Sequence, residues 1–213
     1  MFAKLVFGTA TLLVLVGVPV TAETWAGAEL DHSVRSATRA LAPGAEITRV
    51  EPHGRPFLAA LMKGEVSSAY ADVRGPAGTT TLILQRLHRD TGRVNRVLWF
   101  SRVAQSVPLV PVKTADGAYS PTGTAELDGR QVRVTYAATV ENGRVSVVPK
   151  EVTVDGRTEP RGRTSGWRTR LAPHPFQLPA SGRLTVRAVS VGDDGITVEL
   201  QQRDVDVRRG ADA

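Results

Sequence analysis

Residues 131–154 read QVRVTYAATVENGRVSVVPKEVTV and predict a β-hairpin that sets the fold class of this chain. Apolar and polar residues alternate over residues 131–140, as they do in a strand that buries one face. Asn142-Gly143 is the residue pair most typical of a tight hairpin turn, and apolar residues return over residues 145–154. An antiparallel sheet is therefore the main element of the predicted structure.

The same alternation of strands and turns continues along the chain on both sides of this hairpin. Turn-forming pairs recur along the chain, at Thr91-Gly92, Asp116-Gly117, Asp128-Gly129, Asp155-Gly156 and Asp194-Gly195. Between them we predict further strands, at residues 79–88, 94–103, 184–191 and 196–207. No helix separates these strands, which excludes a parallel α/β sheet. Residues 155–179 lack periodicity and are predicted to be a loop or strap.

The N-terminal segment predicts export. Lys4 is the one charged residue of the first four, and residues 5–18 are mainly apolar. Small residues follow at positions 19–22, so residues 1–22 are predicted to be a secretory signal that is cleaved after Ala22. A second Ala-x-Ala site ends at Ala28. The alternative is an uncleaved membrane anchor, because residues 5–22 are close to the shortest length that crosses a bilayer.

Two helices are predicted after this leader. Apolar residues at intervals of three and four form one face of a helix over residues 23–41: Ala26, Leu30, Val34, Ala37 and Leu41. Pro56 and Gly64 bracket a short apolar helix over residues 56–63. The predicted fold class is α+β, a long antiparallel meander curved around the N-terminal amphipathic helix. Residues 23–210 are expected to be a single domain, and residues 211–213 a tail.

The composition removes several kinds of chemistry. The chain has 213 residues and no cysteine, which excludes a disulfide scaffold, a thiol nucleophile and a cysteine-based metal site. Its four histidines are scattered, and it has neither a phosphate-binding glycine loop nor a nucleophile elbow. We predict no catalytic residues, no metal and no cofactor. A hydrolase or transferase of unrecognised type is the remaining enzymatic alternative.

The formal charge of +6 arises from 27 Lys and Arg against 21 Asp and Glu. Several arginines surround Trp167 in the predicted loop: Arg157, Arg161, Arg163, Arg168 and Arg170. This region is either a solvated loop or a cationic rim for an anionic headgroup, with Arg163, Trp167 and Arg168 as the candidates. We expect no nucleic-acid partner, because export removes the protein from nucleic acid and the chain lacks the repeated aromatic residues of a stacking platform.

Several segments together resemble a known family. They are the helix up to Leu41 directly after the apolar leader, the segment PFL at 56–58, VRG at 73–75, GRLTVRAVSVGDDGI at 182–196 and RDVDV at 203–207. In this order and spacing the chain resembles the LmeA-type phospholipid-binding proteins of the actinobacterial cell envelope. The resemblance implies an extracytoplasmic lipid-binding protein that supports the synthesis of envelope lipids or lipoglycans of the lipomannan type. It also implies a fold like that of the tubular lipid-binding domains.

A long sheet around one amphipathic helix can leave an apolar groove, which favours the same function. Burying about ten methylene groups at about 0.8 kcal/mol each yields about 8 kcal/mol, enough for micromolar binding. The expected partners are a phospholipid or glycolipid, with an anionic headgroup, and a membrane surface. The candidate lipid contacts, each of which could instead be core, are Leu30, Val34, Phe57, Leu61, Met62, Leu98 and Phe100. The alternative function is a ligand-free scaffold of the envelope.

Overall fold

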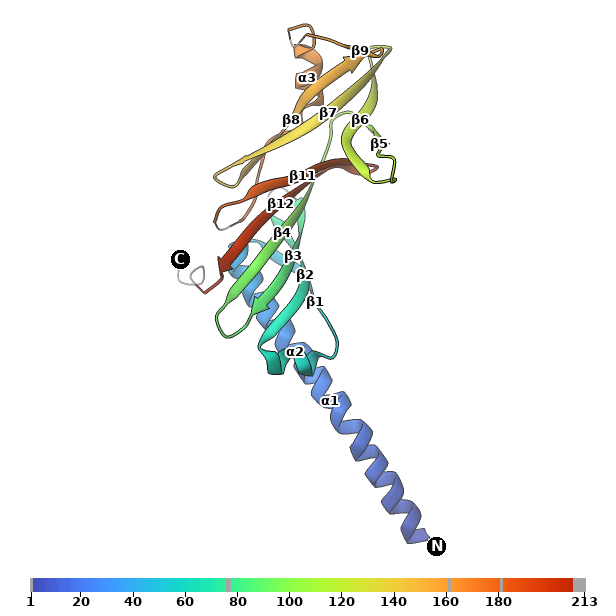
Figure 1. The fold of residues 1–213 in the computed structure, drawn as a ribbon, viewed down its shortest axis with the longest axis vertical. Coiled ribbons are helices and arrows are strands. Elements are labelled where there is room, and N and C mark those ends of the chain that lie inside the picture. The colour runs from blue at the N-terminus through green and yellow to red at the C-terminus, as the bar shows by residue number, and fades with distance from the viewer. Residues whose placement is uncertain (1, 76–77, 161, 181, 209–213) are drawn as a thin grey trace.

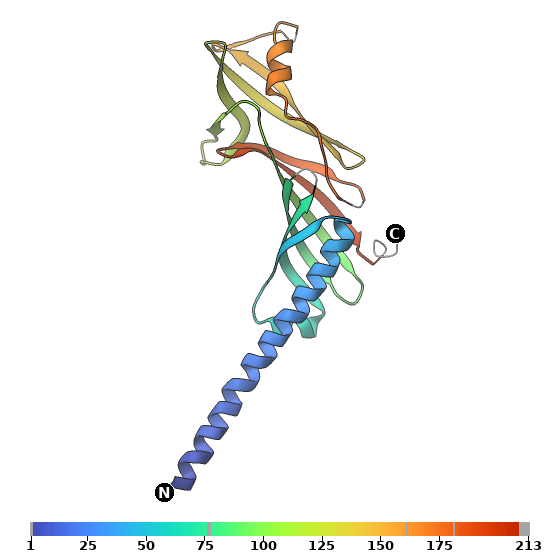
Figure 2. The ribbon, with the colours of Figure 1, turned by 180° about the vertical axis from the view of Figure 1, so that it is seen from behind.

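The strands form two antiparallel sheets that follow one another along the long axis of the molecule, and a long helix projects from one end (Figure 1). The view from behind shows the same arrangement (Figure 2). This computed structural model describes residues 2–75, 78–160, 162–180 and 182–208. The predicted tail, residues 211–213, and Arg161 lie outside the described residues.

The first sheet has the strand order β1-β2-β3-β4-β12-β11 and curls into half a barrel. Its strands are β1 (Glu46–His53), β2 (Glu65–Gly75), β3 (Gly78–His88), β4 (Arg93–Val103), β11 (Thr185–Gly192) and β12 (Gly195–Asp206). β12 lies between β4 and β11, with Ile196 opposite Val103 and Leu200 opposite Trp99. The chain therefore leaves this sheet after β4 and returns to it after the second sheet.

The second sheet has the order β10-β8-β7-β6-β5, and β9 pairs with β8. Its strands are β5 (Val110–Lys113), β6 (Tyr119–Leu127), β7 (Arg130–Glu141), β8 (Arg144–Val154), β9 (Arg157–Thr158) and β10 (Phe176–Gln177). The predicted hairpin is confirmed: Glu141 pairs with Arg144, and Asn142 and Gly143 have the positive φ angles that a tight hairpin turn needs. Gly123 of β6 lies so close to β11 that a Cβ atom there would be 3.1 Å from Val191 Cγ1.

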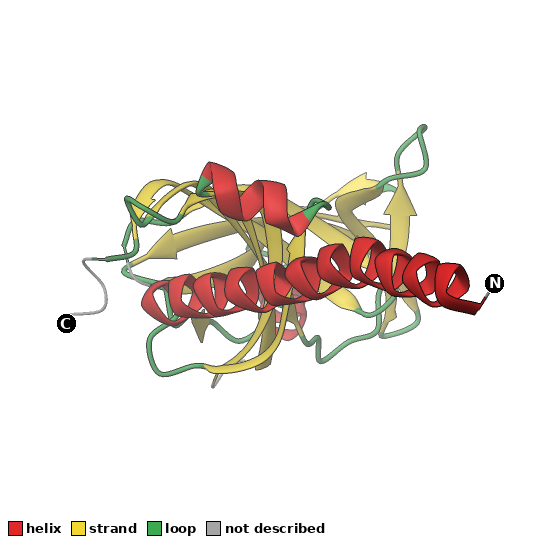
Figure 3. Ribbon diagram, turned by 90° about the horizontal axis from the view of Figure 1, so that it is seen from below, coloured by secondary structure: helices red, strands yellow, loops and turns green. Residues whose placement is uncertain are grey.

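Within the described residues three helices accompany the sheets: α1 (Phe2–Leu41), α2 (Phe57–Lys63) and α3 (Ser165–Leu171). α1 runs across the strands, with α2 beside it (Figure 3). The predicted apolar face of α1 is buried from Ala26 to Leu41, and from Leu30 onwards it belongs to one core with Leu82 and Trp99 of the first sheet. Of the helices in the described part of the chain, none combines the length and the apolar character that crossing a membrane requires.

The α+β class and the antiparallel sheets are confirmed, but two finer predictions are wrong. The strands do not form a single meander, because β12 pairs with β4 across about 90 residues of intervening chain. Residues 155–179 are not wholly irregular, because α3 and the short strands β9 and β10 lie within them. α3 has seven residues, too few for a helical period to stand out in the sequence. The tubular lipid-binding fold remains a prediction.

Candidate functional site

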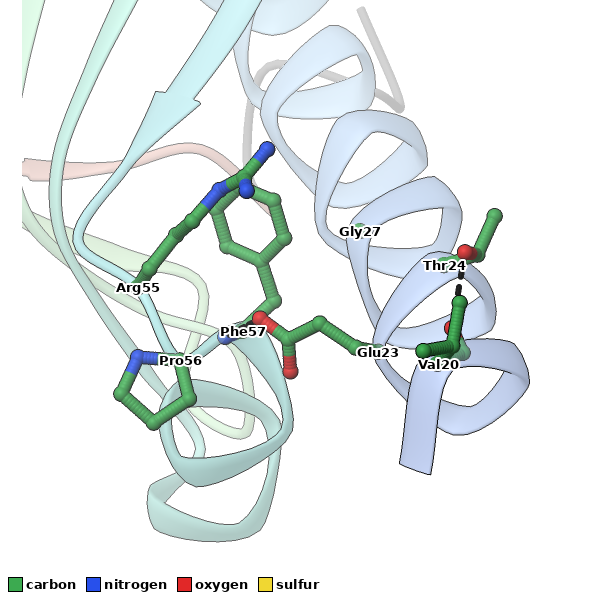
Figure 4. A pocket seen from close by; sticks show the side chains of 7 residues that line it. All are labelled: Val20, Glu23, Thr24, Gly27, Arg55, Pro56 and Phe57. Carbon is green, nitrogen blue, oxygen red and sulfur yellow. Dashed lines mark hydrogen bonds between the residues drawn. The ribbon is translucent and has the colours of Figure 1, made fainter. Parts of the chain in front are cut away.

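An open cleft of about 860 Å³ lies where α1 leaves the first sheet. One wall comes from α1, at positions 20, 23, 24 and 27, whose spacing places them on one side of the helix. The other wall comes from Arg55, Pro56 and Phe57, at the start of α2 (Figure 4). The volume lies within the range of about 300–1,000 Å³ that is typical of small-molecule sites.

Glu23 connects the two walls of the cleft. Its carboxylate accepts hydrogen bonds from the backbone N–H of Phe57 at 2.5 Å and from that of Leu58 at 3.0 Å. The first N–H groups of a helix have no partner inside it, and Pro56 at the N-cap supplies no side-chain acceptor. Glu23 therefore caps α2 from a different helix. The hydrogen bonds from Leu58 and Phe57 lower the pKa of Glu23 below its ordinary value, so the carboxylate is charged at neutral pH.

Phe57 lies against the backbone of α1 because position 27 is a glycine. A Cβ atom on Gly27 would be 3.0 Å from Cδ2 of the Phe57 ring. The guanidinium of Arg55 lies over the same ring, with Cζ 5.4 Å from the ring centroid, a cation–π contact (Figure 4). A second cleft of about 630 Å³ shares Gly27, Arg55 and Phe57 and extends to His53 and the end of β1. Arg55 and Phe57, which stack on each other, therefore border both clefts.

The cleft offers an apolar wall with charge at its edge. Val20, Pro56 and Phe57 supply the apolar surface, and Arg55 supplies the cation. The carboxylate of Glu23 is already engaged by two backbone N–H groups. In the ranges that the structure describes, no three His, Cys, Asp or Glu side chains come together as a metal site would need. The arrangement suits an apolar chain that ends in an anionic group.

The structure brings part of the predicted lipid-contact set to this end of the molecule. Phe57 lines the cleft, Leu61 packs at the edge of the core, and Met62 is 82% exposed. Leu30 and Val34 are fully buried beneath the first sheet, so they are core residues in this structure.

Leu98 and Phe100 lie on the other face of the first sheet. Side chains alternate along a strand, and Trp99 between them faces the core with α1. Leu98 is nevertheless buried, and Phe100 lines a separate cleft with Asp72 and Thr81. The two residues therefore do not share the cleft of Phe57.

The predicted cationic rim lies at the opposite end of the molecule, where α3 covers the second sheet (Figure 1). Trp167 donates a hydrogen bond from Nε1 to Asp128 Oδ2 at 2.9 Å. Arg168 donates to Thr164 Oγ1 at 2.9 Å and to the backbone carbonyl of Pro149 at 2.5 Å. Trp167 and Arg168 thus hold α3 in place. Arg163 is exposed, and its Nη1 atom lies 3.9 Å from Oε2 of Glu159.

Sequence reasoning missed Glu23 and Arg55. Arg55 directly precedes the proline that opens the predicted short helix, a position at which a basic side chain could have been noticed. Glu23 gives no comparable signal, because its partners are 34 and 35 residues away in the sequence.

The chain was compared with protein-family models, with curated proteins and with solved structures, and none of the three comparisons found a match. The resemblance to the LmeA-type family therefore remains a prediction.

Proposed function

We propose that this protein is an extracytoplasmic phospholipid- or glycolipid-binding protein that supports lipid or lipoglycan synthesis in the cell envelope, and that it binds rather than catalyses. The cleft between α1 and the start of α2 is the observation that carries the proposal. It joins an apolar wall to one cation, and it lies where the predicted apolar leader meets the domain.

In this proposal the acyl chain lies along Pro56 and Phe57, and also along Val20 where the leader stays on the chain, and its burial supplies most of the binding free energy. Each buried methylene contributes about 0.8 kcal/mol. An anionic headgroup lies at Arg55, where one basic residue contributes about 1 kcal/mol. Acyl burial therefore sets the affinity, and Arg55 sets the preference among headgroups.

The second candidate is a scaffold that binds another envelope protein without a lipid. The edge strand β5 of the second sheet favours it, because an exposed edge can pair with a strand of a partner. Val110 at the start of β5 and Tyr119 at the start of β6 are large exposed apolar side chains near this edge.

The test is uptake of a fluorescent phosphatidylglycerol and of its phosphatidylcholine counterpart by the full chain. Phe57→Ala should weaken the binding of both about tenfold, which corresponds to about 1.4 kcal/mol. Phe176→Ala is the matched control, since Phe176 is also half-buried but lies on β10. It should leave uptake unchanged.

Arg55→Gln should lower the preference for phosphatidylglycerol about fivefold and leave phosphatidylcholine binding intact, because it removes the cation and leaves the Phe57 ring in the apolar wall. Arg163→Gln, at the other end of the molecule, is its control. If the wild-type chain takes up neither probe, the lipid-binding proposal is wrong and the scaffold is favoured. If Phe57→Ala and Phe176→Ala bind alike, the site has been placed in the wrong cleft.

A further inference from the structure

Large apolar side chains are exposed around the end of the molecule from which α1 projects. Trp25 and Val20 of α1 are 61% and 60% exposed, and Met62 and Leu58 of α2 are 82% and 36% exposed. We call these four residues the apolar end. Single exposed apolar residues are common on soluble proteins, but four large ones on two helices that contact each other indicate an interaction surface.

α2 contributes to this surface without forming part of the deep core. Every residue of α2 is at least partly exposed, although the helix reads FLAALMK. Phe57 faces α1, whereas Leu58 and Met62 face solvent. Glu23 holds the first turn of α2 against α1, so the position of this helix is set by α1.

The apolar end is continuous with the apolar run of the chain. α1 continues as one helix from the buried residues back to Phe2, and residues 5–18 hold mainly apolar residues. Val20 and Trp25 are five residues apart, which places them about 140° apart around the helix. Apolar residues on two sides of a helix are expected where lipid surrounds it. Tryptophan is enriched at the boundary between headgroups and acyl chains.

Positive charge accompanies these apolar side chains. Arg55 precedes α2 and Lys63 ends it, and both are exposed. Two carboxylates lie beside α2: that of Glu23 is engaged by backbone N–H groups at the start of the helix, and that of Asp90 lies beside Gly64 at its end. Apolar groups flanked by exposed cations match the chemistry of an anionic membrane surface.

We infer that the apolar end docks on the surface of an anionic phospholipid bilayer. Leu58, Met62 and Trp25 enter the boundary between headgroups and acyl chains, and Arg55 and Lys63 lie at the phosphate groups. Docking requires neither a membrane-spanning helix nor lipid uptake by the cleft. It also survives cleavage after Ala22, because Trp25 and α2 follow that site. Docking would bring the mouth of the cleft to the lipid.

The test uses the absence of native cysteine, which allows a single label at a chosen position. Met62→Cys and Val148→Cys are each labelled with an environment-sensitive fluorophore in the full chain. Val148 is the matched control, a 46% exposed apolar residue on β8 at the other end of the molecule. The labelled proteins are mixed with vesicles of phosphatidylglycerol or of phosphatidylcholine, and quenching by iodide is measured.

We expect phosphatidylglycerol vesicles to lower the iodide quenching constant about fivefold or more at position 62 and to leave it unchanged at 148. Lys63→Glu should abolish most of this protection, and 1 M salt should weaken it, because the Debye length falls to about 3 Å.

Equal quenching at positions 62 and 148 in the presence of vesicles would overturn the docking surface. Equal protection by the two lipids would overturn the anionic partner. Uptake of the fluorescent lipid is measured on the same proteins without vesicles. Failure to dock and failure to bind lipid are therefore read independently.

Discussion

Val34 provides the sharpest test of which side of α1 is core. Its side chain is 0% exposed in the cluster that contains Leu30 and Trp99. Val34→Ala removes two buried methyl groups, and at about 1 kcal/mol for each, with the cavity included, unfolding becomes easier by about 2 kcal/mol. For a chain of this length each kcal/mol lowers the melting temperature by about 2–4 °C, so we expect a fall of about 4–8 °C.

Val34→Asp should be far more damaging, because it places a carboxyl group in an apolar interior without a partner. The cost is several kcal/mol, set against the roughly 5–15 kcal/mol that holds a domain folded. Burial raises the pKa of the introduced carboxyl in the folded state, so the loss of stability is largest above that raised pKa, shrinks as the pH falls from it towards the unfolded pKa of about 3.9, and is smallest below 3.9. Melting followed by circular dichroism between pH 3 and pH 7 measures both effects.

Ser36→Asp is the control, since Ser36 lies on the same helix and is exposed. It should melt within about 2 °C of the wild type, as surface substitutions do. If Val34→Asp stays folded and loses lipid uptake, the groove lies beneath α1 and not beside α2. If it stays folded and retains uptake, the packing described for α1 is wrong.

Two further predictions concern the contacts that hold the short helices. Glu23→Gln removes the charged cap of α2 and should speed amide exchange at Phe57 and Leu58. In the wild type this cap stabilises the fold above the ordinary pKa of 4.5 and is lost as the pH falls towards the lowered value, so the variant and the wild type should exchange alike in acid. Unequal exchange of the variant and the wild type in acid would contradict the capping role of Glu23. Asp128→Asn keeps a residue that tolerates the positive φ of this turn but weakens the bonds to Trp167 and Arg170. Amide exchange should rise in α3 while lipid uptake is unchanged; a loss of uptake would show that α3 belongs to the site.

Local patterns predicted the elements that depend on neighbours in the sequence. The 131–154 hairpin follows from alternation and a turn pair, and the buried face of α1 from its helical spacing. α2 begins after Pro56 and ends at Gly64, whose φ of 65° provides the left-handed cap that glycine favours.

Pairings between distant segments were beyond the same reasoning. Nothing in the alternation of β12 indicates that it lies beside β4 rather than only beside β11. The run Val97-Leu98-Trp99-Phe100 is apolar at every position, so it does not indicate which face is turned to the core. In the candidate site, too, local patterns could be predicted and contacts between distant segments could not. Phe57 was predicted from the apolar short helix, whereas Glu23 has a role only because tertiary packing brings the start of α2 to it.

The place of β12 beside β4 also determines when the first sheet can be completed during synthesis. β4 emerges about 90 residues before the strand that pairs with it, an interval of about 5–20 s at the usual rate of translation. During that interval the edge of β4 has unpaired backbone groups and is a template for aggregation. Strands β5 to β8 are neighbours both in the sequence and in the second sheet, so they can pair before β12 has been synthesised. In the nascent chain, β4 is therefore the strand whose edge needs protection longest. A chain without β12 would leave the half-barrel open between β4 and β11.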